Sequence, residues 1–310
     1  MAYDIIGDIH GQADKLHALL AHMGYQEKGG AFRHPDRTAI FVGDFIDRGN
    51  KQYESVMTVR RMVEEGSAQA IMGNHEFNAI AWHTMDPANP DHFLRPHHGK
   101  VGEKNRRQHA AFLAEVESNV ARHKEVIAWF LTLPLWLDLP QVRVVHACWH
   151  DGYMNELRPY LSPGLQLTPE LMVSASRPDS MEYRTVEGLT KGLEIDLPEG
   201  HSFLDKDETV RKNVRIRWWD ADAVTYCDLA LAPDELRERL PRLPIERDIR
   251  TPYDNTKPVF FGHYWMTGQA KAQTPTIACV DYSAGKGGPL VAYRWDGEDH
   301  LDNRNFASVA

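Results

Sequence analysis

The sequence of 310 residues is short of cysteine, of long apolar runs and of positive charge, and each shortage excludes a class of protein. The three cysteines, Cys148, Cys227 and Cys279, lie far apart and are odd in number, which is typical of a reducing cytosol and not of a disulfide framework. No apolar run approaches the roughly 18 residues of a membrane span. The opening MAYDIIGDIHG has no basic stretch followed by an apolar one, so we expect no signal peptide and a cytoplasmic protein.

The net charge of −9 limits the partners that the chain can attract. An acidic protein gains no bulk attraction to nucleic acid or to anionic lipid, so we expect neither membrane binding nor bulk nucleic-acid binding. A phosphate-bearing ligand would need a local cationic site, which bound metal ions can provide. The hydrophobic content of 42% is ordinary for a globular protein with a sizeable core, and the sequence leaves the oligomeric state open.

The first part of the chain repeats a pattern of strand, loop and helix, which is typical of parallel α/β folds. Short apolar runs that end at glycine predict the strands, and apolar residues at helical spacing predict the helices. The expected strands are 3–6, 38–42 and 68–72, and the expected helices are 16–23, 56–63 and one that follows Asn74. Ligands in such folds collect at the carboxyl ends of strands, so the polar residues after each strand are expected at one sheet edge.

The rest of the chain predicts further strands around a long insertion. Residues 85–100 are rich in Pro, Asn, Asp and His, and we expect a long loop there. Residues 150–254 are weakly patterned and are expected to form an insertion with short helices, such as one at 233–240. The other expected elements are helices at 103–120 and 123–131 and strands at 142–145, 258–261, 276–280 and 290–295.

Three polar motifs follow the expected strands, namely GDIHG at 7–11, GDFIDRG at 43–49 and GNHE at 73–76, and two single histidines follow later strands. Their carboxylate, amide and imidazole groups suit Mn²⁺, Fe or Zn²⁺ and suit Ca²⁺ poorly. The spacing of Asp8 and His10 turns both side chains to one side of an extended segment, and the two oxygens of Asp44 could bridge two ions. Each motif alone also fits an ordinary turn. Together they predict a two-metal centre formed by Asp8, His10, Asp44, Asn74, His146 and His263.

This set of motifs, with FGHY at 261–264, resembles the phosphoprotein phosphatase branch of the calcineurin-like metallophosphoesterases. That branch includes Ser/Thr protein phosphatases and bacterial diadenosine tetraphosphatases, and both ends of this chain look most like the latter. The resemblance covers about 3–83, 123–150 and 258–296. It implies an α/β fold of two facing mixed β-sheets flanked by helices. The metal ligands lie far apart in the sequence, so we expect a single domain over 1–310 with the insertion embedded at about 150–254.

The resemblance also implies roles for individual residues. Asp8 and His10 would hold one metal ion with Asp44, which would bridge to a second ion held by Asn74, His146 and His263. His75 would protonate the leaving group with Asp47 orienting it, and Arg48 would bind the phosphate. The ions would be divalent transition metals, with Mn²⁺ the first choice and Fe or Zn²⁺ the alternatives. The two ions would lower the pKa of a shared water, and the resulting hydroxide would attack phosphorus.

Several residues depart from the family pattern or keep two interpretations. Trp149 and Tyr282 replace small residues of the family and either pack or line the pocket, with packing favoured for Trp149. Trp218 and Trp219 either stack on a substrate ring or anchor the insertion to the core. A second phosphate-binding arginine is expected, and the sequence does not choose among Arg184, Arg215 and Arg217. Surface or packing roles are favoured for Cys148, His92, His97 and His98, whereas Glu54 fits an acidic position of the family and a helical surface residue equally well.

Three functions remain compatible with the sequence. The first is hydrolysis of a phosphate monoester, either a phosphoprotein or a small phosphate ester. The second is hydrolysis of dinucleoside polyphosphates such as diadenosine tetraphosphate, and the third is a catalytically inactive binding module. The intact ligand set argues against the third function. The complete pair Asp47-Arg48 favours the first, whereas the resemblance of the two chain ends favours the second.

Overall fold

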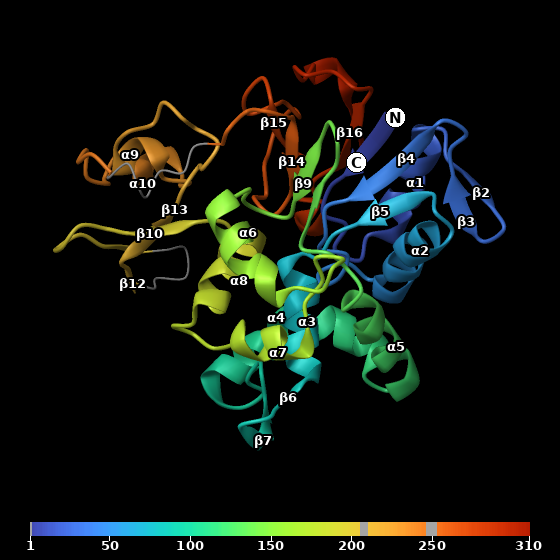
Figure 1. Ribbon diagram of the computed structural model, residues 1–310, viewed down its shortest axis with the longest axis horizontal. Coiled ribbons are helices and arrows are strands. Elements are labelled where there is room, and N and C mark those ends of the chain that lie inside the picture. The colour runs from blue at the N-terminus through green and yellow to red at the C-terminus, as the bar shows by residue number, and fades with distance from the viewer. Residues whose placement is uncertain (1, 205–209, 246–252) are drawn as a thin grey trace.

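The computed structural model describes residues 2–204, 210–245 and 253–310, and two mixed β-sheets lie at its centre (Figure 1). The larger sheet has the order β17-β16-β1-β4-β5, in which β1 is parallel to β4 and antiparallel to β16. The smaller sheet has the order β15-β14-β9-β8, in which β14 is parallel to both of its neighbours. The strands of the larger sheet are β1 (Ala2–Ile6), β4 (Arg37–Phe41), β5 (Ala68–Ala70), β16 (Leu290–Trp295) and β17 (Phe306–Val309). Those of the smaller sheet are β8 (Trp136–Asp138), β9 (Arg143–Val145), β14 (Val259–Phe261) and β15 (Ile277–Cys279).

The two sheets face one another across a shared apolar core. Ile5 of β1 and Ile40 of β4 pack with Val144 of β9 and Phe260 of β14 in one cluster of fully buried side chains. Successive side chains of a strand point to opposite faces, so the neighbours of these residues, such as Phe41, pack on the other face under the helices. Both faces of these strands are therefore buried, which explains why they appear in the sequence as continuous apolar runs.

The helices predicted for the first half of the chain are confirmed. Leu16, Leu19 and Leu20 form the buried stripe of the first helix, as their spacing indicated. Asn119 accepts a hydrogen bond from the backbone N–H of Arg122 at 3.0 Å and so caps the fifth helix. The helices are α1 (Ala13–His22), α2 (Gln52–Glu64), α3 (Asn74–His83), α4 (Gly99–Val116) and α5 (Val120–Phe130).

The prediction of a long loop over residues 85–100 is wrong. Strands β6 (Met85–Asp86) and β7 (Asn89–Phe93) form a short hairpin, and α4 begins at Gly99. The polar residues that suggested a loop instead form the hairpin turn, because the Asp86 carboxylate accepts the backbone N–H of Ala88 at 2.9 Å. The sequence also gave no indication of β8, of β17 or of the small hairpin of β2 (Gln26–Lys28) and β3 (Ala31–Arg33).

The segment expected to be an insertion contains short helices and small hairpins, which Figure 1 shows in green, yellow and orange. Residues 205–209 and 246–252 of this segment lie outside the described residues, and its status as an insertion in a single domain stays a prediction. Its helices are α6 (Asp151–Leu157), α7 (Pro169–Ser174), α8 (Met181–Lys191), α9 (Tyr226–Leu229) and α10 (Asp234–Arg237). Its strands are β10 (Glu194–Asp196), β11 (Phe203–Leu204), β12 (Val210–Arg211) and β13 (Asn213–Arg215). Single 3₁₀ turns lie at η1 (Arg158–Tyr160), η2 (Ala284–Lys286) and η3 (Asn303–Asn305).

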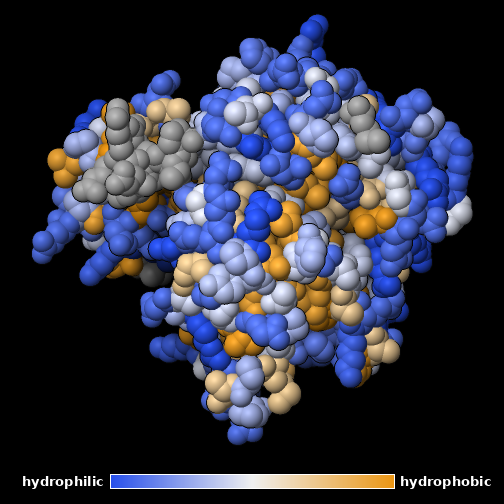
Figure 2. All heavy atoms as spheres, in the orientation of Figure 1, coloured by the Kyte–Doolittle hydropathy of each residue, from blue (hydrophilic) through white to orange (hydrophobic). Residues whose placement is uncertain are grey.

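The surface in Figure 2 is mostly hydrophilic, with smaller apolar areas between the charged side chains. This is the usual surface of a chain in which a quarter of the residues are charged. Within the described residues, no helix combines the length and the hydrophobicity that crossing a membrane requires.

Trp218 and Trp219 anchor the segment to the core, which decides between the two interpretations that the sequence allowed. Both are buried, at 3% and 7% exposure. The indole N–H of Trp218 donates to the Ala147 carbonyl at 2.9 Å, and its ring lies 5.2 Å from the ring of Phe261 in β14. Both tryptophans therefore join the segment to the smaller sheet through packing and one buried hydrogen bond.

We predict that Trp218→Ala lowers the free energy of unfolding by about 3–5 kcal/mol, because it leaves a large cavity and an unpaired carbonyl. Denaturant unfolding followed by fluorescence measures the change. Tyr160→Ala is the matched control, since Tyr160 is 49% exposed and its loss should cost little. Equal changes in the two variants would contradict the anchoring role of Trp218.

Candidate metal centre

The six candidate metal ligands lie where strands of both sheets end. Asp8 and His10 follow β1, Asp44 follows β4, His146 follows β9, His263 follows β14, and Asn74 is the first residue of α3. The loops that carry them turn sharply: His10, Asp44 and His263 have φ values of 50°, 53° and 70°, in the left-handed region that side chains rarely adopt. Strain of this kind is concentrated at functional sites, where surrounding contacts hold it in place.

The glycines of the motifs let these loops approach one another closely. A Cβ added at Gly43 would lie 2.5 Å from the backbone nitrogen of Gly73, and one at Gly262 would lie 2.0 Å from an oxygen of Asp8. Neither position has room for a side chain. The glycines thus allow the loops after β4, β5 and β14 to meet at the site.

The first group of donor atoms surrounds Asp44 on the side of β1. The Nε2 atom of His10 lies 3.8 Å from Oδ2 of Asp44, and the ligand atoms of His10, Asp44 and His75 all lie within 4.8 Å of one another. His10 donates from Nδ1 to the Ile46 carbonyl at 2.9 Å, which leaves the lone pair of Nε2 facing the centre. Oδ2 of Asp8 accepts the backbone N–H of His263 at 2.9 Å.

The second group lies on the other side of Asp44. Oδ2 of Asp44 is 3.3 Å from Nε2 of His146, and Oδ1 of Asn74 lies 3.2 Å from the same nitrogen and 2.9 Å from Nδ1 of His263. His146 donates from Nδ1 to the Val42 carbonyl at 2.7 Å, so Nε2 is again the nitrogen with the free lone pair. The Asp44 carboxylate is therefore common to both groups of donor atoms.

The charges at this site fit bound cations. Burial raises the pKa of Asp8, and the carboxylates of Asp281 and Asp44 raise it further. Oδ1 of Asp8 and Nε2 of His10 are buried without a hydrogen-bond partner among the described residues. Burial and the nearby Arg215 guanidinium hold the pKa of His263 well below its usual value, which keeps the ring neutral as a ligand must be. Buried oxygen and imidazole donors of this kind match a divalent transition metal.

A chain of three side chains lies beside the ligands. His75 and Asp47 are joined at 2.5 Å, from Nδ1 to Oδ2, and the other oxygen of Asp47 lies 2.8 Å from Nδ1 of His109 in α4. Burial lowers the pKa of His75, but the carboxylates of Asp44 and Asp47 outweigh this effect and raise it. His75 can therefore carry a proton in a partly buried position. Sequence reasoning missed His109, because a single histidine on a helix carries no motif.

Glu76 of the third motif binds the backbone of the loops that carry the candidate metal ligands. Its carboxylate accepts backbone N–H groups of Asp44 and Phe45, both at 2.8 Å, and of Gly73 at 3.0 Å. Burial and the charge of Asp44 raise the pKa of Glu76 to about 7. The motif was recognised in the sequence, but this link between the loops after β4 and β5 depends on the fold and was not predicted.

Arg48 lies at the mouth of the centre, in a cavity of about 560 Å³ that also reaches Asn74, His75 and His263. Its guanidinium lies 5.8 Å from the ring centre of Trp265, which in turn stacks on His10 at 4.9 Å. The cationic side chains that line this cavity are Arg48, Arg95, Lys104, Lys191, Arg211 and Arg215. Sequence reasoning missed Arg95, Lys104 and Trp265, and it named Arg215 as one of three candidates.

The substrate contacts expected for Arg217, Trp218 and Trp219 are corrected by the structure, since none of the three lines this cavity. The tryptophans are buried, and Arg217 bonds to the Asp228 carbonyl and lies 3.4 Å from Asp220. Arg184 lies at the surface and pairs with Glu156 at 2.8 Å. Arg215 is the candidate that reaches the site, with Nη1 at 3.1 Å from Nε2 of His263.

The other residues with two interpretations are in packing or surface positions. Trp149 and Tyr282 are buried, and Cys148 is fully buried. The ring of His97 stacks on Trp82 at 3.7 Å. Glu54 lies at the surface, 3.7 Å from Lys51.

Comparison with known proteins identifies the class. The family model of the calcineurin-like phosphoesterases matches residues 1–263, so the chain belongs to that family and is a metallophosphoesterase, a hydrolase that uses divalent metal ions. Two solved phosphatases show the same fold at 14% identity. A cold-active protein tyrosine phosphatase has a TM-score of 0.52, with 99% of this chain and 78% of that chain covered. A Saccharomyces cerevisiae protein serine/threonine phosphatase has a TM-score of 0.50, with 100% and 79% covered.

Several relatives are named as bis(5'-nucleosyl)-tetraphosphatases. The asymmetrical enzyme PrpE of Bacillus velezensis is 46% identical over 76 residues, or 24% of this chain and 30% of the relative. PrpE of Oceanobacillus iheyensis is 32% identical over 158 residues, or 51% of this chain and 58% of the relative. The chain thus spans between 30% and 58% of the length of these PrpE relatives. The symmetrical enzyme of Vibrio vulnificus is 24% identical over 305 residues, or 96% of each chain.

Asp44→Asn should lower both metal content and turnover of an aryl phosphate, because the amide supplies no negative charge to the two donor groups. Loss of a group that only supports a metal ligand costs roughly 10–100-fold, so we expect loss of the ligand itself to cost at least as much. Elemental analysis and initial rates measure it. Asp14→Asn, which removes an exposed carboxylate paired with Lys51, is the control. Wild-type metal content and rate in Asp44→Asn would exclude Asp44 as a shared ligand.

His75→Asn should slow hydrolysis of an alkyl phosphate more than that of an aryl phosphate with an acidic phenol. A general acid typically contributes about 10²–10⁴-fold, and it matters most when the departing oxygen is basic. Comparing kcat for the two substrates gives the difference directly. His17→Asn, at a half-buried histidine on α1, controls for substitution of a histidine elsewhere. An equal loss on both substrates would show that His75 acts on the metal ions or the nucleophile.

Proposed function

We propose that Asp8, His10, Asp44, Asn74, His146 and His263 hold two divalent metal ions, with Mn²⁺ the first choice, and that the chain hydrolyses phosphoanhydride bonds of nucleoside polyphosphates. Dinucleoside polyphosphates are the substrate class that we favour. Bound at this site, the ions would supply positive charge to the reacting phosphate and lower the pKa of water. Fe or Zn²⁺ would suit the same donors.

The chain's own residues would then position and protonate the substrate. Arg48 presents a planar fork of N–H donors that matches two phosphate oxygens. His75 holds a proton next to the place where the leaving oxygen departs, and Asp47 fixes its ring through Nδ1. His109 holds the second oxygen of Asp47, so that the carboxylate stays aligned with His75.

Arg95 carries the argument for a substrate with more than one phosphate. It lines the catalytic cavity, and burial lowers its pKa. Its Nη2 donates to Oε1 of Gln108 at 2.9 Å, its Nε has no hydrogen-bond partner, and among the described residues no carboxylate forms an ion pair with it. The carboxylates of Asp47 and Glu187 raise the pKa of Arg95 but do not outweigh its burial, so an anionic ligand would add counter-charge that no direct ion pair supplies. Lys104 on α4 lines the same cavity and adds a second cation.

The arrangement of these cations favours a chain of phosphates over a single phosphate. Arg48 and the metal ligands suffice to bind one phosphate group, and Arg95 and Lys104 add two further cations to the same cavity, from the segment after β7 and from α4. The relatives named as bis(5'-nucleosyl)-tetraphosphatases support the same class. Phosphate monoesters are the second candidate, because the complete set of His75, Asp47 and Arg48 is sufficient for them.

A substrate panel on wild type and on Arg95→Gln tests this proposal. We expect wild type to cleave diadenosine tetraphosphate with higher kcat/KM than a phosphoserine peptide or an aryl phosphate. Arg95→Gln should lower kcat/KM for the tetraphosphate by about 10–100-fold, the effect of losing a hydrogen bond to a charged group, with little change on the aryl phosphate.

Arg107→Gln is the matched control, because it removes an exposed arginine of the same region on α4. It should leave both activities unchanged. A preference of the wild type for the phosphopeptide would overturn the proposal in favour of monoesters. An equal loss on both substrates in Arg95→Gln would remove the support that Arg95 gives.

A further inference from the structure

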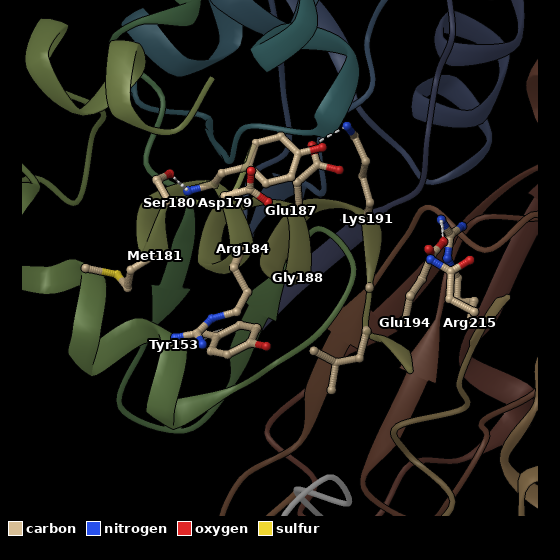
Figure 3. A pocket seen from close by; sticks show the side chains of 14 residues that line it. Tyr153, Asp179, Ser180, Met181, Arg184, Glu187, Gly188, Lys191, Glu194 and Arg215 are labelled. Atoms are coloured by element: carbon tan, nitrogen blue, oxygen red, sulfur yellow. Dashed lines mark hydrogen bonds and ion pairs between the residues drawn. The ribbon is translucent and has the colours of Figure 1, made fainter. Parts of the chain in front are cut away.

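Figure 3 shows a second cavity, which has a volume of about 660 Å³. Its walls come from Tyr153 of α6, from the first to the last turn of α8, and from β10 and β13. This volume lies within the range of small-molecule pockets. The two cavities are adjacent, because they share part of their walls: the common residues are Tyr183, Glu187, Lys191, Glu194 and Arg215.

The charges of this second cavity are balanced, in contrast to those around Arg95. Three acidic and three basic side chains line it: Asp179, Glu187, Glu194, Arg184, Lys191 and Arg215. Each of its cations has an acidic partner. Lys191 pairs with Glu187, Arg215 with Glu194 at 3.2 Å, and Arg184 with Glu156 at 2.8 Å. Figure 3 shows Lys191 and Glu187 joined on one wall and Arg215 next to Glu194 on another. A neutral group therefore fits here better than a phosphate does.

Tyr183 offers this cavity an aromatic face. Its side chain is half-buried, and it lies on the wall that both cavities share. Within the described part of the chain, its ring has no aromatic partner. Tyr153 differs, because His150 stacks on it at 3.9 Å and the Arg184 guanidinium lies 5.5 Å from its ring centre. Tyr183 is thus the tyrosine of this cavity whose ring has no aromatic or cationic partner among the described residues, and Asn213, whose amide can both donate and accept hydrogen bonds, lines the same cavity.

We propose that this cavity binds the nucleobase of a nucleoside polyphosphate, with Tyr183 stacking on the base while the phosphate chain runs past Arg215 into the catalytic cavity. The proposal rests on the proposed function and names the residues that would select a nucleotide over other polyphosphates. Arg215 suits the junction because it lines both cavities and lies 3.1 Å from His263. Arg48, Arg95 and Lys104 of the catalytic cavity form no ion pair among the described residues and would face the phosphates, whereas the ion-paired Arg184 and Lys191 would lie beside the neutral base.

The test compares Tyr183→Ala with Tyr183→Phe on three substrates: diadenosine tetraphosphate, inorganic tripolyphosphate and an alkyl phosphate. Base stacking on an aromatic side chain is worth roughly a 5- to 150-fold change in affinity. We expect Tyr183→Ala to lower kcat/KM for diadenosine tetraphosphate by a factor in this range, chiefly through KM. Tyr183→Phe keeps the ring and should stay near wild type. Neither variant should change hydrolysis of tripolyphosphate or of the alkyl phosphate, which lack a base.

Two controls separate this proposal from the proposed function. Unchanged alkyl phosphate hydrolysis shows that a variant is folded with an intact catalytic centre, and Tyr160→Ala controls for loss of a tyrosine elsewhere. Should Tyr183→Ala fail this check, Tyr183→Leu, which keeps an apolar side chain without a stacking face, takes its place with the same expected result. Equal losses on diadenosine tetraphosphate and tripolyphosphate, or no loss on either, would overturn the nucleobase site while leaving the phosphatase activity intact.

Binding provides a readout that does not depend on turnover. Equilibrium dialysis of adenosine 5'-diphosphate against wild type and the Tyr183 variants measures the base contact directly. Weaker binding in Tyr183→Ala and unchanged binding in Tyr183→Phe would support the nucleobase site. Binding that is the same in all three proteins would overturn it. If wild type cleaves the alkyl phosphate but neither polyphosphate, the proposed function fails, and the dialysis result still decides on the nucleobase site.

Discussion

The structure depends on holding several carboxylates together, out of water, where two sheets end. Asp8, Asp44, Glu76 and Asp281 are all nearly fully buried. Such a cluster is unstable unless N–H donors and positive charge compensate it. Each of these carboxylates accepts at least one backbone N–H, and Asp281 accepts those of Trp265 at 2.7 Å and Ser283 at 2.9 Å. The remaining need for positive charge is what cations at the centre would meet, and the sharp loops and tight glycines place the donors for them.

The local parts of this arrangement could be predicted from the sequence, and the distant ones could not. Strands that are buried on both faces leave continuous apolar runs, and the short motifs after them contain both the ligands and the turn glycines, so β1, β4, β14 and their polar residues were predicted. His109 and Arg95 reach the cavity only because α4 and the hairpin before it fold back over it. A single histidine or arginine without a surrounding motif does not predict that its side chain will line the cavity.

The two tryptophans are a second case in which the sequence alone could not predict the position of a side chain. Trp218 and Trp219 were possible stacking residues because they are large aromatics in a weakly patterned segment. The fold buries them against Phe261, and the aromatic side chains that line the cavity are instead Tyr153 and Tyr183. Composition can indicate that a segment has aromatic residues to offer a ligand, but burial decides which of them is available. In the same way, the fold favoured Arg215 over Arg184 and Arg217, which the sequence could not separate.

Membership of the calcineurin-like phosphoesterases defines the chemistry, whereas the pattern of paired and unpaired cations around the centre is our guide to the substrate. The claim on which both depend is that two metal ions sit on either side of Asp44. Anomalous diffraction from crystals soaked in Mn²⁺ tests it most directly. The account predicts two peaks, one bounded by Asp8, His10 and Asp44 and the other by Asp44, Asn74, His146 and His263. Peaks elsewhere, or none at this sheet edge, would contradict it.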